Sequence, residues 1–361
     1  MRHLLTLLLL SMITASCSLN DNTIIEENNN EIYFPPLSGN EWEAVSPSSL
    51  NWNTTELEEL YTYLELKNTK GFIILKDGKI AVEKYFNGHS QNTSWRWFSA
   101  VKSLTATAIG IAQDEEFINI NNRTSDYLGS NWSILTKEKQ DLITVKNHLS
   151  MTTGLKNTPN NILAWTCIAP LCMSYNYDAG TKWQYHQGAF SQLQRILSLN
   201  TGKNFKVYIK EKILDKTGIS GSWETFLDVN IFSSSTRGMA RFGLLALNKG
   251  KWEEKIIVSE DYFNEMTNTS QNLNKAYGYL WWLNGKESYK TPQSEQIYAG
   301  KLIPNAPNDL LAALGANDQK IYVIPSKNMV VIRCGESAEN AELATSSFDN
   351  ELWGRLNSVT N

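Results

Sequence analysis

The sequence predicts an α/β fold of the α+β kind: an antiparallel sheet built from N- and C-terminal segments, flanked by helices and interrupted by a mainly helical insertion. Short apolar runs typical of strands lie near both ends of the 361-residue chain, at 72–75, 80–86, 310–314, 320–324 and 329–334. Between about 100 and 248, apolar residues instead recur at helical spacing. Because a sheet must cover its apolar face, strands from both chain ends can share one sheet under the intervening helices.

The boundaries of several elements follow from local signals. A helix is predicted over 56–66, where leucines recur at helical spacing. The next two strands flank residues 76–79, whose Asp-Gly pair is the strongest hairpin signal in the chain. Residues 325–328 are predicted to turn between the last two strands, and a helix over 341–356 is predicted to follow them.

Composition excludes several classes of protein. The 33 basic and 37 acidic side chains leave a net charge of −4, which argues against the basic surface that a nucleic-acid-binding protein needs. A hydrophobic content of 42% supplies a real core and excludes wholesale disorder. We therefore expect a globular protein with no nucleic-acid partner.

The first residues have the features of an export signal. A basic start precedes an apolar run over 4–13, which is too short to span a bilayer, and small residues precede Cys17. This junction resembles the lipobox of bacterial lipoproteins, although Thr14 replaces the usual aliphatic residue. The alternative is an ordinary secreted protein with a stray cysteine. The predicted organisation is a signal peptide at 1–16, a flexible tether at 17–32 that follows lipidated Cys17, a sheet domain at 33–110 and 240–361, and a mainly helical domain at 111–239.

The other cysteines fit an oxidising compartment. Cys167 and Cys172 enclose four residues, a spacing that can close a small loop by a disulfide. Cys334 ends an apolar run and is predicted to be a buried thiol. The four histidines form no metal-binding pattern, so we expect no metal site.

Ser99 and Lys102 are the strongest local candidates for chemistry. A serine hydroxyl is a poor nucleophile until a base removes its proton. A lysine three residues later lies on the same helical face, and the positive end of the helix dipole lowers its pKa. The S-x-x-K pattern also occurs by chance, and the alternative is a helix start with a solvated lysine. The chain has no G-x-S-x-G turn, no Walker A loop and no G-x-G-x-x-G, so an α/β-hydrolase and a nucleotide-binding protein find no support.

Several blocks together resemble the serine β-lactamase-related family, which includes class C β-lactamases, D,D-peptidases, esterases and 6-aminohexanoate-dimer hydrolases. The first is the stretch from Trp97 to Ser103, continuing through Gly110-Ile111-Ala112. The next are ITVKNHLSMTTGL at 143–155 and GTKWQYHQ at 180–187, and further similar blocks follow at 234–250, 277–282 and 321–332. The resemblance covers most of residues 70–335 in the family's order. It implies a β-lactamase/transpeptidase-like fold.

The resemblance also implies roles for individual residues. Ser99 would be the acylated nucleophile, Lys102 its proton acceptor, and Tyr185 a partner in general acid–base catalysis. Gln187 stands where the second motif, Y-x-N, usually ends in asparagine. The backbone N–H groups of Ser99 and, most nearly, Gln319 would form the oxyanion hole.

The third motif departs from the family pattern. It normally reads Lys or His, any residue, then Gly, but here it aligns with Ala316-Asn317-Asp318 and lacks both the cation and the glycine. That cation normally helps to hold a substrate carboxylate, so its absence weakens the antibiotic and D,D-peptidase interpretations more than esterase or amidase chemistry. Asn317, Gln319, Trp97 and Trp183 are the remaining predicted substrate-binding residues.

We therefore expect an exported serine hydrolase that acts through an acyl-enzyme on a small ester, amide or peptide-like substrate, without metal or organic cofactor. A lipid anchor would hold it to a membrane of the bacterial cell envelope. Two alternatives stay open: a non-catalytic cell-envelope binding protein on the same fold, and a weak β-lactamase or D,D-peptidase.

Overall fold

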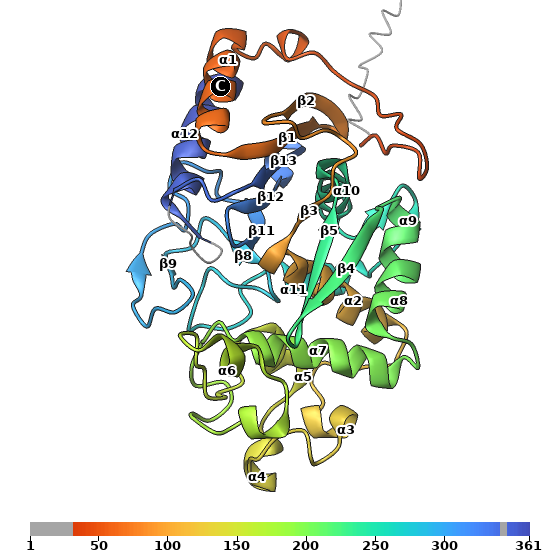
Figure 1. Ribbon diagram of the computed structural model, residues 1–361, viewed down its shortest axis with the longest axis vertical. Helices are drawn as coiled ribbons and strands as arrows, with labels where there is room; N and C mark the ends of the chain where they lie inside the picture. Colours follow the sequence, from red (N-terminus) through yellow and green to blue (C-terminus); the bar gives the residue numbers. More distant parts are fainter. Residues whose placement is uncertain (1–31, 340–344) are drawn as a thin grey trace, which may run out of the picture. The chain divides into compact units, whose positions relative to one another are not determined.

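The computed structural model describes residues 32–339 and 345–361, which belong to one compact unit, Ile32–Asn361 (Figure 1). The predicted signal peptide, Cys17 and the tether up to residue 31 lie outside the described residues. Within the described ranges, no helix is long and apolar enough to cross a membrane. The division into a sheet domain and a helical domain stays a prediction.

A six-stranded antiparallel sheet organises the molecule, and it confirms the predicted fold class. Its strands, in spatial order, are β2 (Lys79–Tyr85), β1 (Thr69–Lys76), β13 (Met329–Gly335), β12 (Gln319–Ile324), β11 (Leu311–Gly315) and β8 (Trp282–Leu283). The N-terminal hairpin pairs directly with the C-terminal strands, because β1 lies between β2 and β13. Every residue of β12 and β13 is buried, which explains why both segments are almost continuous apolar runs.

Helices cover the sheet. α10 (Thr236–Leu247) packs on β1, β12 and β13, whereas α1 (Thr54–Leu66) packs on β1 and on α12 (Ser347–Thr360). The predicted C-terminal helix begins later than expected, since Ser346 and Asp349 form a capping box that starts α12 at Ser347. Residues 340–344, where the prediction placed its first turn, lie outside the described residues.

The middle of the chain is mainly helical. Its helices are α2 (Val101–Asp114), α3 (Thr124–Leu128), α4 (Lys137–Gln140), α5 (Val145–Leu149), α6 (Ile162–Thr166), α7 (Gln187–Asn200), α8 (Phe205–Ile209) and α9 (Asp215–Thr217). α11 (Glu260–Met266) and the short strands β6 (Lys251–Trp252), β7 (Lys255–Ile256), β9 (Ser288–Tyr289) and β10 (Tyr298–Ala299) follow α10. Short 3-10 helices occur at Ser48–Leu50, Phe98–Ala100, Pro170–Cys172 and Pro325–Lys327, and a π-helical turn occurs at Lys210–Leu214.

A second, three-stranded sheet interrupts these helices. β4 (Gly221–Phe226) and β5 (Val229–Ser234) form a hairpin, and β5 also pairs with β3 (Trp95–Arg96). The sequence analysis did not predict this hairpin, because β4 is exposed along most of its length and lacks apolar alternation. It is stabilised by pairing and by ring contact between Trp223 and Phe232, whose centroids are 4.9 Å apart.

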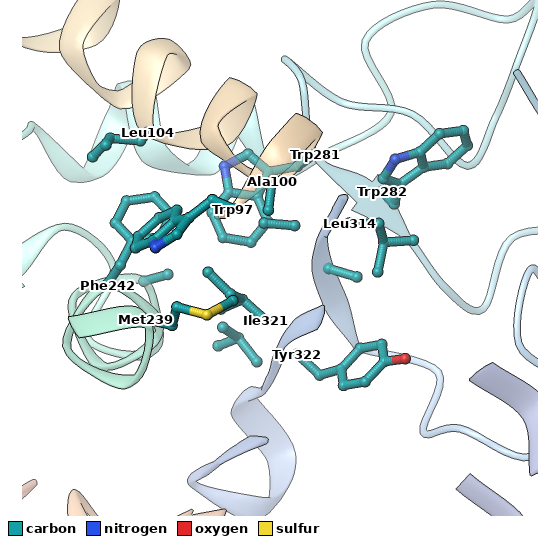
Figure 2. Close-up of a cluster of buried hydrophobic side chains, with 14 of the residues drawn as sticks. Trp97, Ala100, Leu104, Met239, Phe242, Trp281, Trp282, Leu314, Ile321 and Tyr322 are labelled. Atoms are coloured by element: carbon teal, nitrogen blue, oxygen red, sulfur yellow. The ribbon is translucent and has the colours of Figure 1, made fainter. Parts of the chain in front are cut away.

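An aromatic core joins the start of α2 to the main sheet (Figure 2). Trp97 lies at its centre and is fully buried, with its ring 5.2 Å from that of Phe232 and 5.7 Å from that of Phe242. Trp281 also packs against Phe242, with 5.9 Å between centroids. This packing fixes the segment that leads into α2 against α10 and β11.

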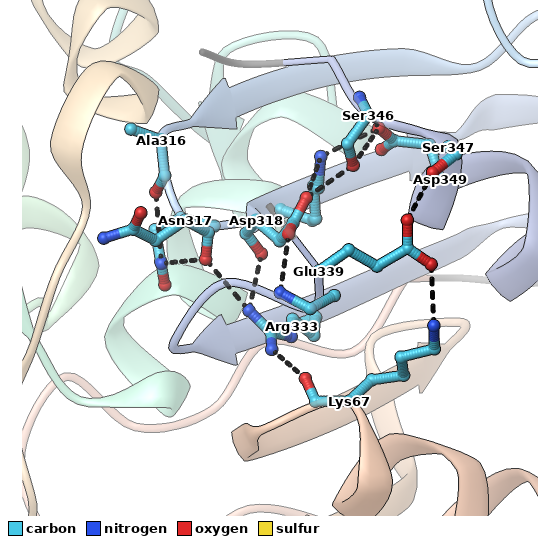
Figure 3. Close-up of polar contacts among 12 residues, drawn as sticks. Lys67, Ala316, Asn317, Asp318, Arg333, Glu339, Ser346, Ser347 and Asp349 are labelled. Carbon is cyan, nitrogen blue, oxygen red and sulfur yellow. Dashed lines mark hydrogen bonds and ion pairs between the residues drawn. The ribbon is translucent and has the colours of Figure 1, made fainter. Parts of the chain in front are cut away.

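A buried polar network supports the turn between β11 and β12 (Figure 3). Arg333, which is fully buried, donates to the carbonyl oxygens of Asn317 at 3.0 Å and Asp318 at 3.1 Å. Lys320, also fully buried, lies 2.8 Å from Asp349 and 3.2 Å from Asp318. Burial alone would raise the pKa of Asp318, but the charge on Lys320 and further hydrogen bonds hold that pKa below its usual range.

We predict that Asp349→Ala lowers the free energy of unfolding by about 3–5 kcal/mol, because it removes a carboxylate from a buried charge pair. It also removes an acceptor of the Tyr322 hydroxyl. The measurement is urea unfolding. Asp215→Ala breaks the exposed ion pair with Lys210 and serves as the control, with an expected loss below about 1 kcal/mol. Equal losses in the two variants would contradict a structural role for the buried pair.

Candidate active site

Ser99 lies in a short turn that runs directly into α2. The Trp97 backbone N–H donates to the Phe232 carbonyl at 2.8 Å, and Trp97 Nε1 donates to Ser234 Oγ at 2.8 Å. Phe98 adopts a φ of 47°, a left-handed conformation that a bulky residue seldom accepts. The tightly held indole on one side and α2 on the other maintain this backbone geometry and present Ser99 at the helix start.

Lys102 lies one turn beyond Ser99, with its amine buried in the protein. Its Nζ lies 3.2 Å from Ser99 Oγ and donates to Gln187 Oε1 at 2.6 Å. The rings of Phe190 and Tyr185 lie 4.5 and 5.1 Å from the same atom. Only 2% of Lys102 is exposed, and no carboxylate of residues 32–339 or 345–361 forms an ion pair with it. Burial therefore lowers the pKa of Lys102 to about 7.

Tyr185 completes the group around Ser99. Its hydroxyl forms a hydrogen bond with the Ser99 side chain, and its ring is enclosed by Trp183, Tyr277 and Trp282. Burial raises the pKa of Tyr185 above its ordinary value, and the hydrogen bond with Ser99 only partly opposes this shift. The phenol therefore keeps its proton at neutral pH. The structure brings together Ser99, Lys102, Tyr185 and Gln187, as the sequence analysis expected.

Two histidines hold the start of α7, and with it Gln187. His186 Nδ1 accepts the Ala189 N–H at 3.1 Å, so its Nε2 carries the proton that points at the Lys156 carbonyl, 3.1 Å away. His148 Nδ1 lies 2.8 Å from the Ala189 carbonyl, and its Nε2 lies 3.0 Å from the Thr124 hydroxyl. Burial lowers the pKa of each histidine to about 4, so both are neutral at physiological pH and stabilise the start of α7 through hydrogen bonds.

A pocket of about 220 Å³ opens beside Ser99. Ser99, Lys102 and Gln187 form its polar part, and Ala316, at the end of β11, also lines it. The rest of the lining is mainly apolar. Phe98 and Val101 flank Ser99, and α6, α7 and the β4–β5 hairpin supply Ile162, Trp165, Phe190, Phe226, Val229 and Ile231 together with the polar Thr166 and Asn230. The sequence analysis did not predict that α6 and the β4–β5 hairpin line the pocket. The apolar residues Ile162, Trp165 and Phe226 are their only sequence signal, and many surface segments share it.

The remaining predicted substrate-binding residues lie away from this pocket. Trp97 and Trp183 are core residues with exposures of 0% and 1%. The Gln319 side chain is fully buried and is occupied by the protein itself, since its amide donates to the carbonyls of Asn317 at 2.6 Å and Gly335 at 2.7 Å. Asn317 is half-buried in the same turn, where its carbonyl accepts from Gln319 and Arg333. These contacts correct the expectation that the side chains of Trp97, Trp183 and Gln319 face a ligand.

Ala316 takes the position beside Ser99 that the sequence analysis gave to Gln319. Ser99 and Ala316 both line the pocket, so their backbone N–H groups are the candidates for an oxyanion hole. Gly315 makes the approach possible, because a Cβ there would lie 2.2 Å from the Trp97 carbonyl oxygen. A pair of backbone N–H groups at one pocket can stabilise a developing oxyanion.

Lys102 is the one charged side chain that lines the pocket among the described residues. Lys320 lies behind the β11–β12 turn in the buried ion pairs described above. Lys290, from the Lys-Thr-Pro sequence at 290–292, lies 4.0 Å from Glu295 and does not line the pocket. The pocket thus lacks a second cation for a substrate carboxylate. No group of three or more His, Cys, Asp or Glu side chains in the described part of the chain could hold a metal ion.

The family profile described as Beta-lactamase matches residues 70–334, which is most of the chain. The chain belongs to the beta-lactamase family. This assignment confirms the resemblance drawn from the motifs and places the protein among serine hydrolases. No curated protein sequence gives a significant match.

Solved structures share this beta-lactamase family fold. One is named as a 6-aminohexanoate-dimer hydrolase from Bacillus anthracis, with a TM-score of 0.67 and 18% identity over 90% of this chain and 88% of the other. Another is named as a beta-lactamase from Bacteroides dorei DSM 17855, with a TM-score of 0.65 and 15% identity over 86% of this chain and 99% of the other. A family VIII carboxylesterase gives a TM-score of 0.60 and 15% identity over 84% and 97%. At these identities the likeness concerns the fold alone.

We predict that Gly315→Ala lowers kcat/KM by about 100-fold, because an added Cβ forces β11 away from the Trp97–Ser99 backbone. The same clash should lower the free energy of unfolding by about 1–3 kcal/mol. Ester hydrolysis and urea unfolding are the measurements. Gly354→Ala, in α12, is the control, since its nearest neighbour would be a side-chain atom 3.3 Å away. Wild-type activity in Gly315→Ala would rule out this close approach as a requirement.

Proposed function

We propose that this protein is an exported serine hydrolase that cleaves a small, uncharged ester or amide through an acyl-enzyme on Ser99. One observation carries the proposal: a buried lysine amine with a pKa lowered to about 7 lies 3.2 Å from the serine hydroxyl. An amine of that pKa is largely unprotonated at mildly alkaline pH and can accept a proton. Export and anchoring through a lipid on Cys17 rest on residues 1–17 alone.

In the proposed acylation step, the neutral Lys102 amine accepts the Ser99 proton as Oγ bonds to the substrate carbonyl carbon. The carbonyl oxygen becomes an oxyanion, and the backbone N–H groups of Ser99 and Ala316 donate to it. When the intermediate collapses, the bond to the leaving group breaks. The leaving group takes a proton from Tyr185, whose phenol is kept protonated by burial, and Lys102 returns its proton to Tyr185.

Deacylation reverses these roles. A water molecule loses a proton to the same amine and attacks the acyl carbon. The Ser99–carbonyl bond then breaks as the Lys102 ammonium returns that proton to Oγ. Gln187 keeps the Lys102 amine directed at this centre by accepting one of its N–H bonds at 2.6 Å. Lys102 and Tyr185 therefore carry every proton transfer in both steps, and Gln187 orients the amine.

The pocket chemistry supports an uncharged substrate. Its lining provides apolar contact and one amine that is committed to proton transfer, with no further cation for a carboxylate. Solved relatives include a protein named as a carboxylesterase and one named as a 6-aminohexanoate-dimer hydrolase, and ester or amide cleavage accords with both names. The departure in the third motif also leaves a non-catalytic binding protein as the competing function.

We predict that a fluorophosphonate adds covalently to the wild-type protein and not to Ser99→Ala, because the Lys102 amine lies beside the Ser99 hydroxyl. Hydrolysis of p-nitrophenyl esters should fall at least about 1,000-fold in the same variant. The measurements are intact mass and absorbance. Ser103→Ala, one turn further along α2 with its hydroxyl on the Leu280 carbonyl, is the matched control and should label normally. No adduct with a fluorophosphonate or a β-lactam would favour the binding protein.

We predict that kcat/KM rises with pH through a midpoint near 7, because Lys102 accepts a proton only in its neutral form. Activity should fall about tenfold for each pH unit below that midpoint. The measurement is hydrolysis of an uncharged ester between pH 5.5 and 8.5, corrected for spontaneous hydrolysis. A rate independent of pH across this range would show that Lys102 is not the base.

A further inference from the structure

Exposed apolar side chains lie on and next to the two segments, α6 and the β4–β5 hairpin, that line the Ser99 pocket. We call five of them the rim: Ile162 and Leu163 on α6, Leu171 in the turn after it, and Phe226 and Leu227 at the tip of the β4–β5 hairpin. Their exposures are 51%, 64%, 78%, 59% and 44% in that order. Residues 157–177 contain no charged side chain. An exposed apolar cluster of this kind beside a pocket marks a binding surface.

The rim is continuous with the catalytic pocket. Ile162 and Phe226 belong to both, since they line the cavity beside Ser99 and are also more than half exposed. The cavity itself, at about 220 Å³, is smaller than most ligand sites. A substrate group that is too long for the cavity would therefore extend over the rim.

The rim is held in place by covalent and polar links. A disulfide joins Cys167, at the end of α6, to Cys172, with their Cα atoms 5.9 Å apart. Inside that loop the Ile168 N–H donates to Asp228 Oδ2 at 3.1 Å, which ties the loop to the tip of the β4–β5 hairpin. The Ile168 carbonyl accepts from Gln192 Nε2 of α7 at 3.0 Å. Both halves of the rim are thus fixed relative to the pocket.

We infer that the rim binds an alkyl chain of the substrate, so the natural substrate is an ester or amide with a chain too long for the cavity alone. This inference rests on the proposed function. An alkyl chain fits the rim because it needs only apolar contact, and the nearby Asp228 carboxylate already accepts the Ile168 N–H. The chain could belong to the acyl group or to the alcohol, and the two cases share this chemistry.

The test is the dependence of kcat/KM on chain length in two series, p-nitrophenyl esters from acetate to dodecanoate and acetate esters from ethyl to octyl alcohol. Full burial of one methylene group corresponds to about fourfold in kcat/KM. We expect a gain of at least about tenfold between four and eight carbons in one series. No gain in either series, with acetate still hydrolysed, would overturn the rim inference and leave the proposed hydrolase intact.

The double variant Leu163→Ser/Leu171→Ser tests the surface itself. It should lower the ratio of long-chain to short-chain kcat/KM at least about fivefold, because both leucines would contact the chain. Leu66→Ser, at an exposed leucine of α1, is the matched control and should keep the wild-type ratio. A wild-type dimer that the double variant dissociates would assign the rim to a second copy and overturn the inference. Failure of every ester to react, together with absent fluorophosphonate labelling, would overturn the proposed function as well.

Discussion

The chemistry of this protein depends on one buried amine. Lys102 Nζ is enclosed by the rings of Phe190 and Tyr185 and by the Gln187 amide, with no carboxylate partner among the described residues. Burial without a counter-charge disfavours the ammonium form, which is why the pKa of Lys102 falls to about 7. The start of α7, held by two histidines, and the aromatic cluster around Tyr185 both enclose this amine. Both therefore contribute to the reactivity of Ser99.

The main sheet packs against the backbone segment that carries Ser99. β11 approaches the Trp97–Ala100 backbone so closely that only glycine fits at position 315. The turn that follows is supported by the buried Arg333 and Lys320 network rather than by a ligand-binding cation. The close approach of β11 therefore uses Gly315, and no cation other than Lys102 lines the pocket among the described residues. The consequence is a site that can stabilise an oxyanion but offers little to a substrate carboxylate.

The substrate class depends on the segments that form the pocket walls, which lie in the mainly helical middle of the chain, more than on Ser99 and Lys102. α6 and the β4–β5 hairpin contribute most of the apolar lining, and a disulfide and the Asp228–Ile168 hydrogen bond hold them together. A serine and a lysine on one helix turn can serve many acyl transfers. The segments that surround it decide which group is accommodated.

Local patterns in the sequence were sufficient for the sheet built from both chain ends, for the Ser99–Lys102 pair and for the family. Strand periodicity, an Asp-Gly turn and a three-residue helical spacing are properties of short segments, and they survive in any context. The β4–β5 hairpin, the burial of Trp97 and Trp183, and the place of Ala316 beside Ser99 were decided by the tertiary structure alone. From the sequence alone, a tryptophan is equally compatible with a place in the core and a place in a cleft. Only the packing of segments far apart in the chain determines which apolar side chains fill the interior and which are left to line a pocket.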